Sequence, residues 1–344
     1  MNIGEINKIR EENRLLNEQE IKEKKIILKS KPQNILLILN NTCNLKCVMC
    51  KDYRPSKYII PDLLFNDIMD NMKFFESFSC QGGEPLLFHK FDSIVDKAKE
   101  FYTHLNITTN GQLLKENLLK KMCNLSVTIH ISIDGFDKET YEGIRKGASF
   151  DILKDNLKNL KSIKKEKGFE ELKYELFMVP QKLNYTQVCK AMDFAKLYDF
   201  VGIRFMQVRG FKKDSFMLND EEYNIVKKQI YECINLSNNE KVRIDTDIPM
   251  DYENTPDLKD YLIKDFNDIC LVPWKSISIQ KFGNVSLDCL CNFSRRESVN
   301  TLEEAWNSKY IQDIRKGLIE KKPISSCRNC YKNNLYKENE KYGK

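Results

Sequence analysis

The sequence lacks any apolar run near the ~20 residues that a membrane-spanning helix requires, and residues 1–10 lack the apolar core of a signal peptide. It also has no long block of one charge sign. Its 56 Lys and Arg residues stand against 50 Asp and Glu residues, for a net charge of +6, whereas nucleic-acid-binding proteins usually present a clustered basic face. We therefore expect neither a membrane protein nor a nucleic-acid-binding protein, and we expect the chain to be cytoplasmic.

Disulfide bonds are also unexpected, because cytosolic thiols are kept reduced. The chain nevertheless has 12 cysteines, of which three lie near its start and five near its end. The other four lie in apolar surroundings, where a free cysteine packs as a small hydrophobe. We expect these four to be buried and structural: Cys80, Cys123, Cys189 and Cys233.

A regular alternation of strand and helix patterns occupies the first two thirds of the chain. Predicted strands begin near Ile35, Ser77, His104, Val127, Lys173 and Gly202. The helical patterns between them cover Asp62–Phe74, Phe91–Phe101, Glu116–Met122, Phe150–Lys165 and Tyr185–Leu197. Six strand–helix units in succession predict an α/β fold with a parallel sheet and right-handed crossovers.

The segments before and after this alternation have different patterns. Residues 1–33 form an N-terminal helical extension, with one or two surface helices that end by Pro32. We expect it to cover the bottom of a barrel, with a partner-binding helix as the alternative. A helix from Glu221 to about Leu236 leads out of the alternation, and residues 237–260 are predicted to be a connection.

A second region, residues 261–335, contains a predicted β-hairpin. Its strands are Ser276–Gln280 and Val285–Leu287, joined by a turn that contains Gly-Asn. A helical pattern, Thr301–Leu318, follows, and residues 336–344 are expected to be a frayed tail.

The first cysteine group is Cys43, Cys47 and Cys50, in the spacing CxxxCxxC. A [4Fe–4S] cluster normally takes four thiolates. Three ligands would leave one iron open, as a catalytic zinc site keeps one position for water or substrate. Taken alone, the spacing is also compatible with half a zinc site, a disulfide-rich loop or a chance grouping.

Three polar motifs follow predicted strands. They are Gln81–Pro85 (QGGEP), Thr108–Gly111 (TTNG) and Ser132–Gly135 (SIDG). Barrel enzymes place their ligand sites at the carboxyl ends of the strands. With the cysteine motif, these segments indicate one site at that edge of the sheet.

In these motifs the sequence resembles the radical S-adenosylmethionine (radical SAM) superfamily, over residues 34 to about 332. The resemblance implies an open, partial (β/α)6 TIM-type barrel over residues 34–236 and a [4Fe–4S] cluster on the three cysteines. It also implies SAM bound at the open iron, and an electron donor of the flavodoxin or ferredoxin type. The implied reaction is reductive cleavage of SAM to a 5′-deoxyadenosyl radical, which removes hydrogen from a substrate.

The resemblance also implies a set of cofactor contacts. Glycines let the backbone approach the methionine amine, and a guanidinium suits a carboxylate. A rim-packing Met49, a turn-capping Asp134 and a solvated Arg145 remain alternatives. No substrate-side catalytic residue is assigned. The expected contacts are Met49, Gly82, Gly83, Glu84, Pro85, Asn110, Ser132, Asp134 and Arg145.

The five cysteines near the end of the chain form a second group: Cys270, Cys289, Cys291, Cys327 and Cys330. This group resembles the ligands of a twitch domain, a shortened SPASM domain. Trp306 and Arg315 fall where that family has such residues. The resemblance implies a second [4Fe–4S] cluster, with Cys291 as the alternative to Cys289 and a zinc site as the alternative to the cluster. The implied ligands are Cys270, Cys289, Cys327 and Cys330.

The sequence alone does not identify the substrate. We expect a sugar- or aminocyclitol-like small molecule that the enzyme oxidises or rearranges. A maturase of a ribosomally made peptide is the alternative, mildly disfavoured because no leader-binding module fits before residue 34. A non-catalytic iron–sulfur electron-transfer protein is a third possibility, against which the SAM-binding motifs argue.

Overall fold

The computed structural model describes residues 1–50, 57–208, 216–237, 240–248, 250, 270–287, 295–297, 299–324 and 327. In these residues a ten-stranded sheet has the order β10-β9-β8-β1-β2-β3-β4-β5-β6-β7. The strands are β1 Asn34–Ile38, β2 Ser77–Gln81, β3 His104–Thr109, β4 Val127–Ser132, β5 Leu172–Met178, β6 Gly202–Phe205, β7 Arg243–Thr246, β8 Ser276–Ile279, β9 Asn284–Ser286 and β10 Arg295–Arg296.

The helices alternate with the strands along the chain. They are α1 Ile3–Lys22, α2 Asp62–Asp70, η1 Met72–Phe74, η2 Pro85–Leu87, α3 Phe91–Glu100, α4 Glu116–Lys121, α5 Lys138–Ile144, α6 Phe150–Ile163, η3 Tyr185–Gln187, α7 Lys190–Leu197, α8 Asp220–Ser237, α9 Val272–Lys275, η6 Lys281–Gly283, α10 Leu302–Trp306 and α11 Lys309–Ile319. None of the helices in the described part of the chain is long and apolar enough to cross a bilayer.

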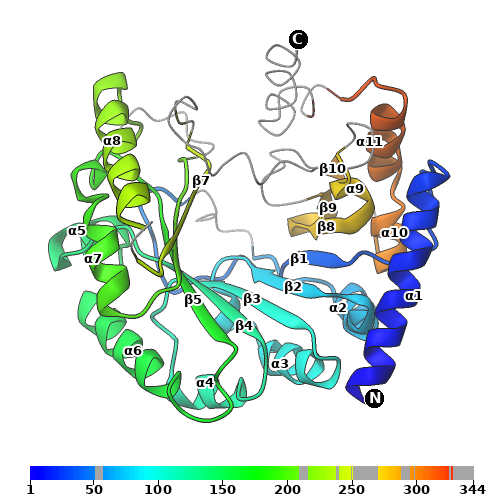
Figure 1. Cartoon of the computed structure of the whole chain (residues 1–344), viewed down its shortest axis with the longest axis horizontal. Coiled ribbons are helices and arrows are strands. Elements are labelled where there is room, and N and C mark those ends of the chain that lie inside the picture. The colour runs from blue at the N-terminus through cyan, green and yellow to red at the C-terminus, as the bar shows by residue number, and fades with distance from the viewer. Residues whose placement is uncertain are drawn as a thin grey trace.

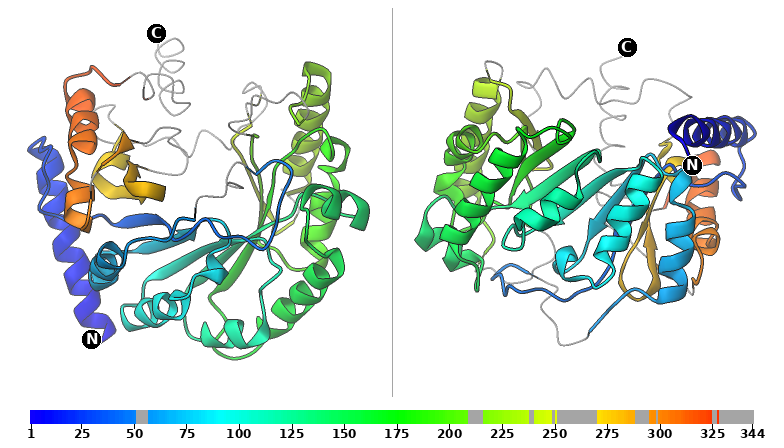
Figure 2. Two further views of the ribbon diagram at one scale, coloured as in Figure 1. Left: turned by 180° about the vertical axis from the view of Figure 1, so that it is seen from behind. Right: turned by 90° about the horizontal axis from the view of Figure 1, so that it is seen from below.

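Strands β1 to β7 are parallel and form an open, partial barrel. Figures 1 and 2 show α3, α4, α6 and α7 along the outer side of the curved sheet. In β1, β2 and β3 every second side chain is buried, as in Leu37, Phe78 and Ile107. These apolar side chains face the helices, so the alternate side chains, which are polar in β2 and β3, face the inner side of the curve.

The predicted fold class is confirmed, and each of the six predicted strands is present. The prediction that residues 237–260 are only a connection is wrong at one point. Strand β7 lies there and pairs with β6, with Gly202 opposite Arg243. This four-residue edge strand, Arg-Ile-Asp-Thr, has one apolar side chain, so its burial pattern is too short to be recognised in the sequence.

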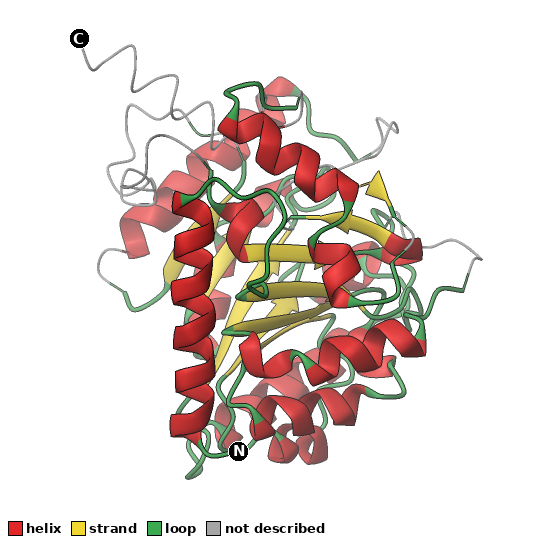
Figure 3. Cartoon of the chain, turned by 90° about the vertical axis from the view of Figure 1, so that its right-hand side faces the viewer, coloured by secondary structure: helices red, strands yellow, loops and turns green. Residues whose placement is uncertain are grey.

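Helix α1 is a single helix that ends at Lys22, ten residues before Pro32. Figure 3 shows it beside the edge of the sheet. Near its start, the Arg10 guanidinium donates to the Phe101 and Lys73 carbonyls at 2.8 and 3.3 Å, below the amino ends of β2 and β3. Farther along, Asn17 donates to the Trp274 carbonyl at 2.8 Å. Helix α1 therefore joins the barrel bottom, as expected, to the region around α9.

The predicted hairpin is present, and it continues the barrel sheet. Strand β8 pairs in parallel with β1 and antiparallel with β9. Phe282 and Gly283 adopt positive φ angles of 57° and 74° in the turn. Strand β10 extends the same sheet beyond β9. The region expected to form a second domain therefore shares the sheet of the first.

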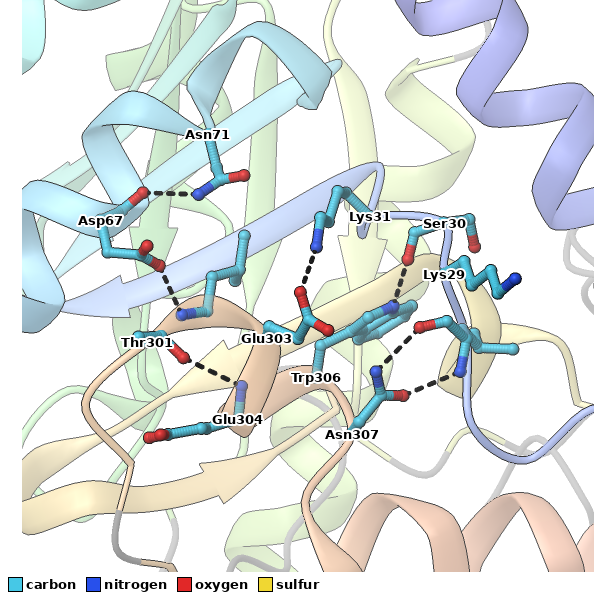
Figure 4. A network of polar contacts seen from close by, with 12 residues as sticks. Lys29, Ser30, Lys31, Asp67, Asn71, Thr301, Glu303, Glu304, Trp306 and Asn307 are labelled. Atoms are coloured by element: carbon cyan, nitrogen blue, oxygen red, sulfur yellow. Dashed lines mark hydrogen bonds and ion pairs between the residues drawn. The ribbon is translucent and has the colours of Figure 1, made fainter.

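The helical pattern Thr301–Leu318 forms two helices, because Ser308 caps the start of α11. The Asn307 side chain donates to the Leu28 carbonyl at 2.8 Å, and the Trp306 indole donates to the Ser30 carbonyl at 2.8 Å (Figure 4). An ion pair of 2.8 Å joins Lys31 to Glu303. These contacts attach the segment after α1 to α10.

Arg315 completes this attachment. Its guanidinium lies 4.4 Å from the centre of the Trp306 ring and donates to the carbonyls of Pro273 and Ile26, each at 2.9 Å. Both side chains are buried. In the described structure, Trp306 and Arg315, the two residues on which the expected twitch resemblance partly depends, therefore hold α9, α11 and the N-terminal segment together.

Candidate functional site

The loop with the first cysteines leaves the carboxyl end of β1 and lies against the exit of β2. The Gly83 N–H donates to the Asn40 carbonyl at 2.9 Å, and the Glu84 N–H donates to the Thr42 carbonyl at 2.7 Å. A Cβ atom on Gly83 would lie 2.2 Å from the Thr42 oxygen. Gly82 has φ of 150°, and a Cβ there would lie 2.3 Å from the Asn40 oxygen. The two glycines are therefore needed for two backbone segments to pack together.

The other side of the loop is attached to the end of α5. The Lys46 N–H donates to the Lys146 carbonyl at 2.8 Å, and the Val48 N–H donates to the Ile144 carbonyl at 2.9 Å. Within the loop, the Cys50 N–H donates to the Cys47 carbonyl at 3.0 Å. Backbone hydrogen bonds thus fix the loop on both sides, independently of its side chains.

Glu84 is fully buried and ties the exit of β2 to that of β3. Its carboxylate accepts hydrogen bonds from the Thr109 hydroxyl at 2.8 Å and the Asn110 N–H at 2.9 Å. Burial raises the pKa of this carboxyl, and these hydrogen bonds oppose the rise. Pro85 begins η2 directly after it. The described contacts of Glu84 are structural, and a contact of its own with SAM stays a prediction.

Asn110 adds a side-chain contact to the cysteine loop. Its Nδ2 donates to Asn44 Oδ1 at 2.8 Å and lies 3.9 Å from Cys43 Sγ. Asn44 is a site residue that sequence reasoning missed, because a polar residue between two cysteines has no distinctive signal of its own. The structure brings Asn110 to the cysteine motif, as the shared edge of the sheet predicts.

Asp134 and Arg145 form a buried ion pair behind the loop. The Arg145 Nη2 lies 2.6 Å from Asp134 Oδ2, and both side chains are more than nine-tenths buried. The Arg145 Nη1 lies 4.0 Å from Cys47 Sγ. Burial raises the pKa of the Cys47 thiol to about 11, and the Arg145 charge opposes this rise. Arg145 is therefore not a solvated helix-end residue.

The exit of β5 supports the same pair. The Val179 N–H donates to Asp134 Oδ1 at 2.8 Å. Asn184, which is buried, donates to the carbonyls of Asp134 and Val179 at 2.9 and 3.1 Å. Ser132 ends β4 nearby in the chain, opposite Phe177 of β5. The predicted residues of β2, β3 and β4 therefore gather at the carboxyl edge of the sheet, and Met49 lies half-buried in the loop itself.

The donor set fits an iron–sulfur cluster better than a single ion. In the described part of the chain, no three His, Cys, Asp or Glu side chains converge as the ligands of one ion do. A four-iron cluster holds its thiolates farther apart than one ion does. Cys43 and Cys50 are exposed and Cys47 is partly exposed, so their sulfurs are accessible to a cluster. Thiolates are the ligands that iron–sulfur clusters take.

The second cysteine group is described only in part. Cys270 is half-buried before α9, and Cys327 is buried. Cys289, Cys291 and Cys330 lie outside the described residues, so the auxiliary cluster stays a prediction.

The four scattered cysteines differ from one another in burial. Cys80 and Cys233 are buried as predicted, whereas Cys123 and Cys189 are partly exposed, so their predicted burial is wrong. The Cys189 thiol donates to Glu232 Oε2 of α8 at 3.0 Å.

Residues 37–194 match the model of the radical SAM superfamily. They include the cysteine loop, the glycine pair and the Asp134–Arg145 pair, so this part of the chain is a radical SAM domain. A radical SAM domain implies a [4Fe–4S] cluster and SAM.

Two of the relatives that match are named for different activities. The chain is 27% identical to GTP 3′,8-cyclase of Aliarcobacter butzleri over 62% of this chain and 67% of that protein. It is 26% identical to the mycofactocin maturase MftC of Mycolicibacterium smegmatis over 42% of this chain and 38% of that protein. For most of the curated relatives that it resembles, the chain matches about half of their length or less.

The fold is similar to two solved enzymes over most of the chain. SuiB of Streptococcus suis bound to S-adenosylmethionine gives a TM-score of 0.65 at 16% identity, over 93% of this chain and 75% of that one. The structure of anSMEcpe with bound AdoMet and Cp18Cys peptide gives a TM-score of 0.61 at 18% identity, over 87% of each chain. At such identities the similarity shows a shared fold.

Proposed function

We propose that this enzyme cleaves SAM reductively at a [4Fe–4S] cluster held by Cys43, Cys47 and Cys50, and that it acts on a peptide. The assignment of the cluster to these three cysteines rests on how their loop is anchored. Backbone hydrogen bonds hold the loop against the exit of β2 and the end of α5, and Asn110 holds it to β3. When bound, the cluster and SAM supply a 5′-deoxyadenosyl radical that takes a hydrogen atom from the substrate.

The residues around the loop orient the cofactor and exclude water from it. Gly82, Gly83 and Glu84 position the exit of β2, while Ser132 and Met49 are candidates for direct contact with SAM. Arg145 already has a carboxylate partner in Asp134. We therefore propose that Arg145 holds the SAM carboxylate while it stays paired with Asp134, so that its guanidinium is shared between the two carboxylates.

Peptide substrates are supported by the solved enzymes of similar fold. SuiB was also solved with its precursor peptide SuiA, with a TM-score of 0.63 to this chain, and anSMEcpe was solved with a bound peptide. The similarity covers 87% of this chain in both cases. We therefore prefer a peptide over the small-molecule substrate expected from the sequence. A small molecule stays the second candidate because the chain is also similar to GTP 3′,8-cyclase.

The second cysteine group completes the proposal. A further [4Fe–4S] cluster would accept the electron that a substrate radical loses when it is oxidised. Its ligands would be Cys270, Cys289 or Cys291, Cys327 and Cys330. We assign it to a twitch region of residues 261–335, following the barrel of residues 34–236. The electron that initiates cleavage would come from a flavodoxin- or ferredoxin-type donor.

The test is anaerobic SAM cleavage. Reconstituted wild-type protein with dithionite and SAM should form 5′-deoxyadenosine, measured by liquid chromatography and mass spectrometry. Cys47→Ala should abolish this product because only the first site leaves an iron open to SAM. Cys123→Ser, a partly exposed cysteine outside the loop, is the matched control and should leave the rate unchanged. Cleavage by Cys47→Ala at the wild-type rate would exclude the assignment.

A further inference from the structure

One row of side chains crosses the inner face of the sheet at its carboxyl edge. Ser132 of β4 lies opposite Phe177 of β5, Phe177 opposite Arg204 of β6, and Arg204 opposite Asp245 of β7. Residues in register on parallel strands project from the same face. The alternate residues Ile131, Leu176 and Ile203 are buried on the helix side. Arg204 therefore shares its face with Ser132, a residue of the SAM site proposed above.

The guanidinium of Arg204 has a hydrogen-bond donor without an acceptor among the described residues. Its nearest carboxylate is that of Asp245, with Nη1 and Oδ2 separated by 3.5 Å, and Asp245 is itself 40% exposed. The Nε–H of Arg204 is buried without a hydrogen-bond acceptor in the described structure. Nε and one Nη form the flat pair of donors that binds a carboxylate through two parallel hydrogen bonds. The long contact with Asp245 is at Nη1, which lies outside this pair of donors.

The neighbouring arginine differs, because it already has a close partner. Arg243 Nη2 lies 2.8 Å from Glu175 Oε1. These residues lie on either side of Gly202, opposite both of them in register. Since glycine has no side chain, the ion pair spans the strand between them. Glu175 is thereby engaged by Arg243, and Arg204 gains no second carboxylate from β5.

Arg204 lies beside a stacked pair of aromatic rings, Phe177 and His130. Its Cζ lies 5.9 Å from the centre of the Phe177 ring, within the range of a cation–π contact. The His130 ring stacks on the same phenyl ring at 4.4 Å and 11°. Burial and the Arg204 charge lower the pKa of His130 to about 4. His130 is therefore neutral at pH 7 and brings no second cation.

The local charges favour one particular kind of anion. Arg204 and Arg243 are balanced by Glu175 and Asp245, so the group as a whole is neutral. A phosphate dianion would meet two carboxylates with only one loosely paired guanidinium to hold it. A single carboxylate requires one flat pair of donors, which Arg204 offers on the side of its unpaired Nε–H.

We infer that Arg204 binds a carboxylate of the peptide substrate and so contributes to substrate selection. This inference rests on the proposed function. Adjacent strands lie about 4.8 Å apart, and Arg204 is two strands from Ser132, so the bound carboxylate lies roughly 10 Å along the sheet from the SAM site. The reacting carbon and the carboxylate would therefore belong to different residues of the peptide, or to opposite ends of one long side chain.

The experiment captures peptides on the immobilised holoenzyme with SAM under anaerobic conditions. The probes are two libraries of random N-acetylated octapeptides, one with amidated and one with free C-termini, and bound peptides are sequenced by mass spectrometry. Because a bidentate carboxylate contact is a strong hydrogen-bonded pair, wild type should enrich carboxylates roughly tenfold. Enrichment of Asp or Glu in the amidated library indicates a side chain, and enrichment confined to the free library indicates the C-terminus.

Three variants complete the test. Arg204→Gln should lose the enrichment, and Arg204→Lys should weaken it because the charge stays but the fork is lost. Lys173→Gln, which removes an exposed charge from the same face near the start of β5, should bind as wild type does. Circular dichroism and melting verify that each variant is folded.

Two results would overturn the inference, and they differ in what else they exclude. Peptides captured without a carboxylate preference, or with one that persists in a folded Arg204→Gln variant, would exclude the role of Arg204 alone. Capture of no peptide by wild type, while SAM cleavage proceeds, would exclude the peptide substrate as well and leave the radical chemistry intact.

Discussion

Replacing Arg145 by Met tests whether the buried ion pair holds the cofactor site together. The change leaves the Asp134 carboxylate fully buried, with the Val179 N–H at 2.8 Å as its remaining hydrogen-bond donor among the described residues. Breaking a buried pair by removing one partner costs about 3–5 kcal/mol. With an unfolding entropy of about 2.1 cal/mol/K per residue, 344 residues give roughly 0.7 kcal/mol per degree. We therefore expect Tm to fall by about 4–7 °C.

The double variant Asp134→Asn with Arg145→Met is the sharper comparison. Removing both charges leaves no buried ion, so most of the lost stability should return. The matched control is Lys138→Met, which breaks an ion pair whose side chains are 64% and 56% exposed. An exposed pair contributes little, and its loss should move Tm by no more than about 1 °C.

Melting is followed by circular dichroism on anaerobically reconstituted protein without SAM, so that cofactor binding does not contribute. If Arg145→Met melts within about 1 °C of wild type, or if the double variant is no more stable than the single one, the pair is not a structural requirement. Loss of SAM affinity without loss of stability would then make cofactor binding the main role of Arg145.

Three further predictions follow from the cysteines and from His130. Reconstituted protein should hold about eight irons per chain; about four irons with bound zinc would contradict the auxiliary cluster. Replacing Cys327 and Cys330 together should preserve SAM cleavage and stop turnover of the true substrate, and a folded double variant that still converts substrate would leave that cluster without a redox role. Because the pKa of His130 falls from 6.5 to about 4 on folding, the unfolded chain binds the proton more tightly between these values, and stability falls as pH drops through this window. His130→Gln should flatten Tm against pH there, and curves parallel to wild type would refute this reasoning.

Local sequence determines most of the elements of this protein. Six of the seven barrel strands and the hairpin follow from apolar alternation and turn residues, which act over a few neighbouring residues. The cysteine spacing and the motifs at Gln81–Pro85 and Thr108–Gly111 are recognisable for the same reason. Since parallel strands bring their carboxyl ends to one edge, the sequence alone also predicts that Asn110 lies beside the cysteine loop, as it does.

Only the tertiary structure decided which partners these residues meet. The sequence predicts that the glycine pair approaches a cofactor amine, whereas its described contacts are with Asn40 and Thr42. It predicts an external carboxylate for Arg145, which is paired with Asp134. Arg204 carries no signal, because a single arginine in a short strand has no periodicity. Its spare fork exists because β5 and β7 place Phe177 and Asp245 beside it. Sequence patterns encode local conformation, while the contacts between distant segments depend on how the strands assemble into the sheet.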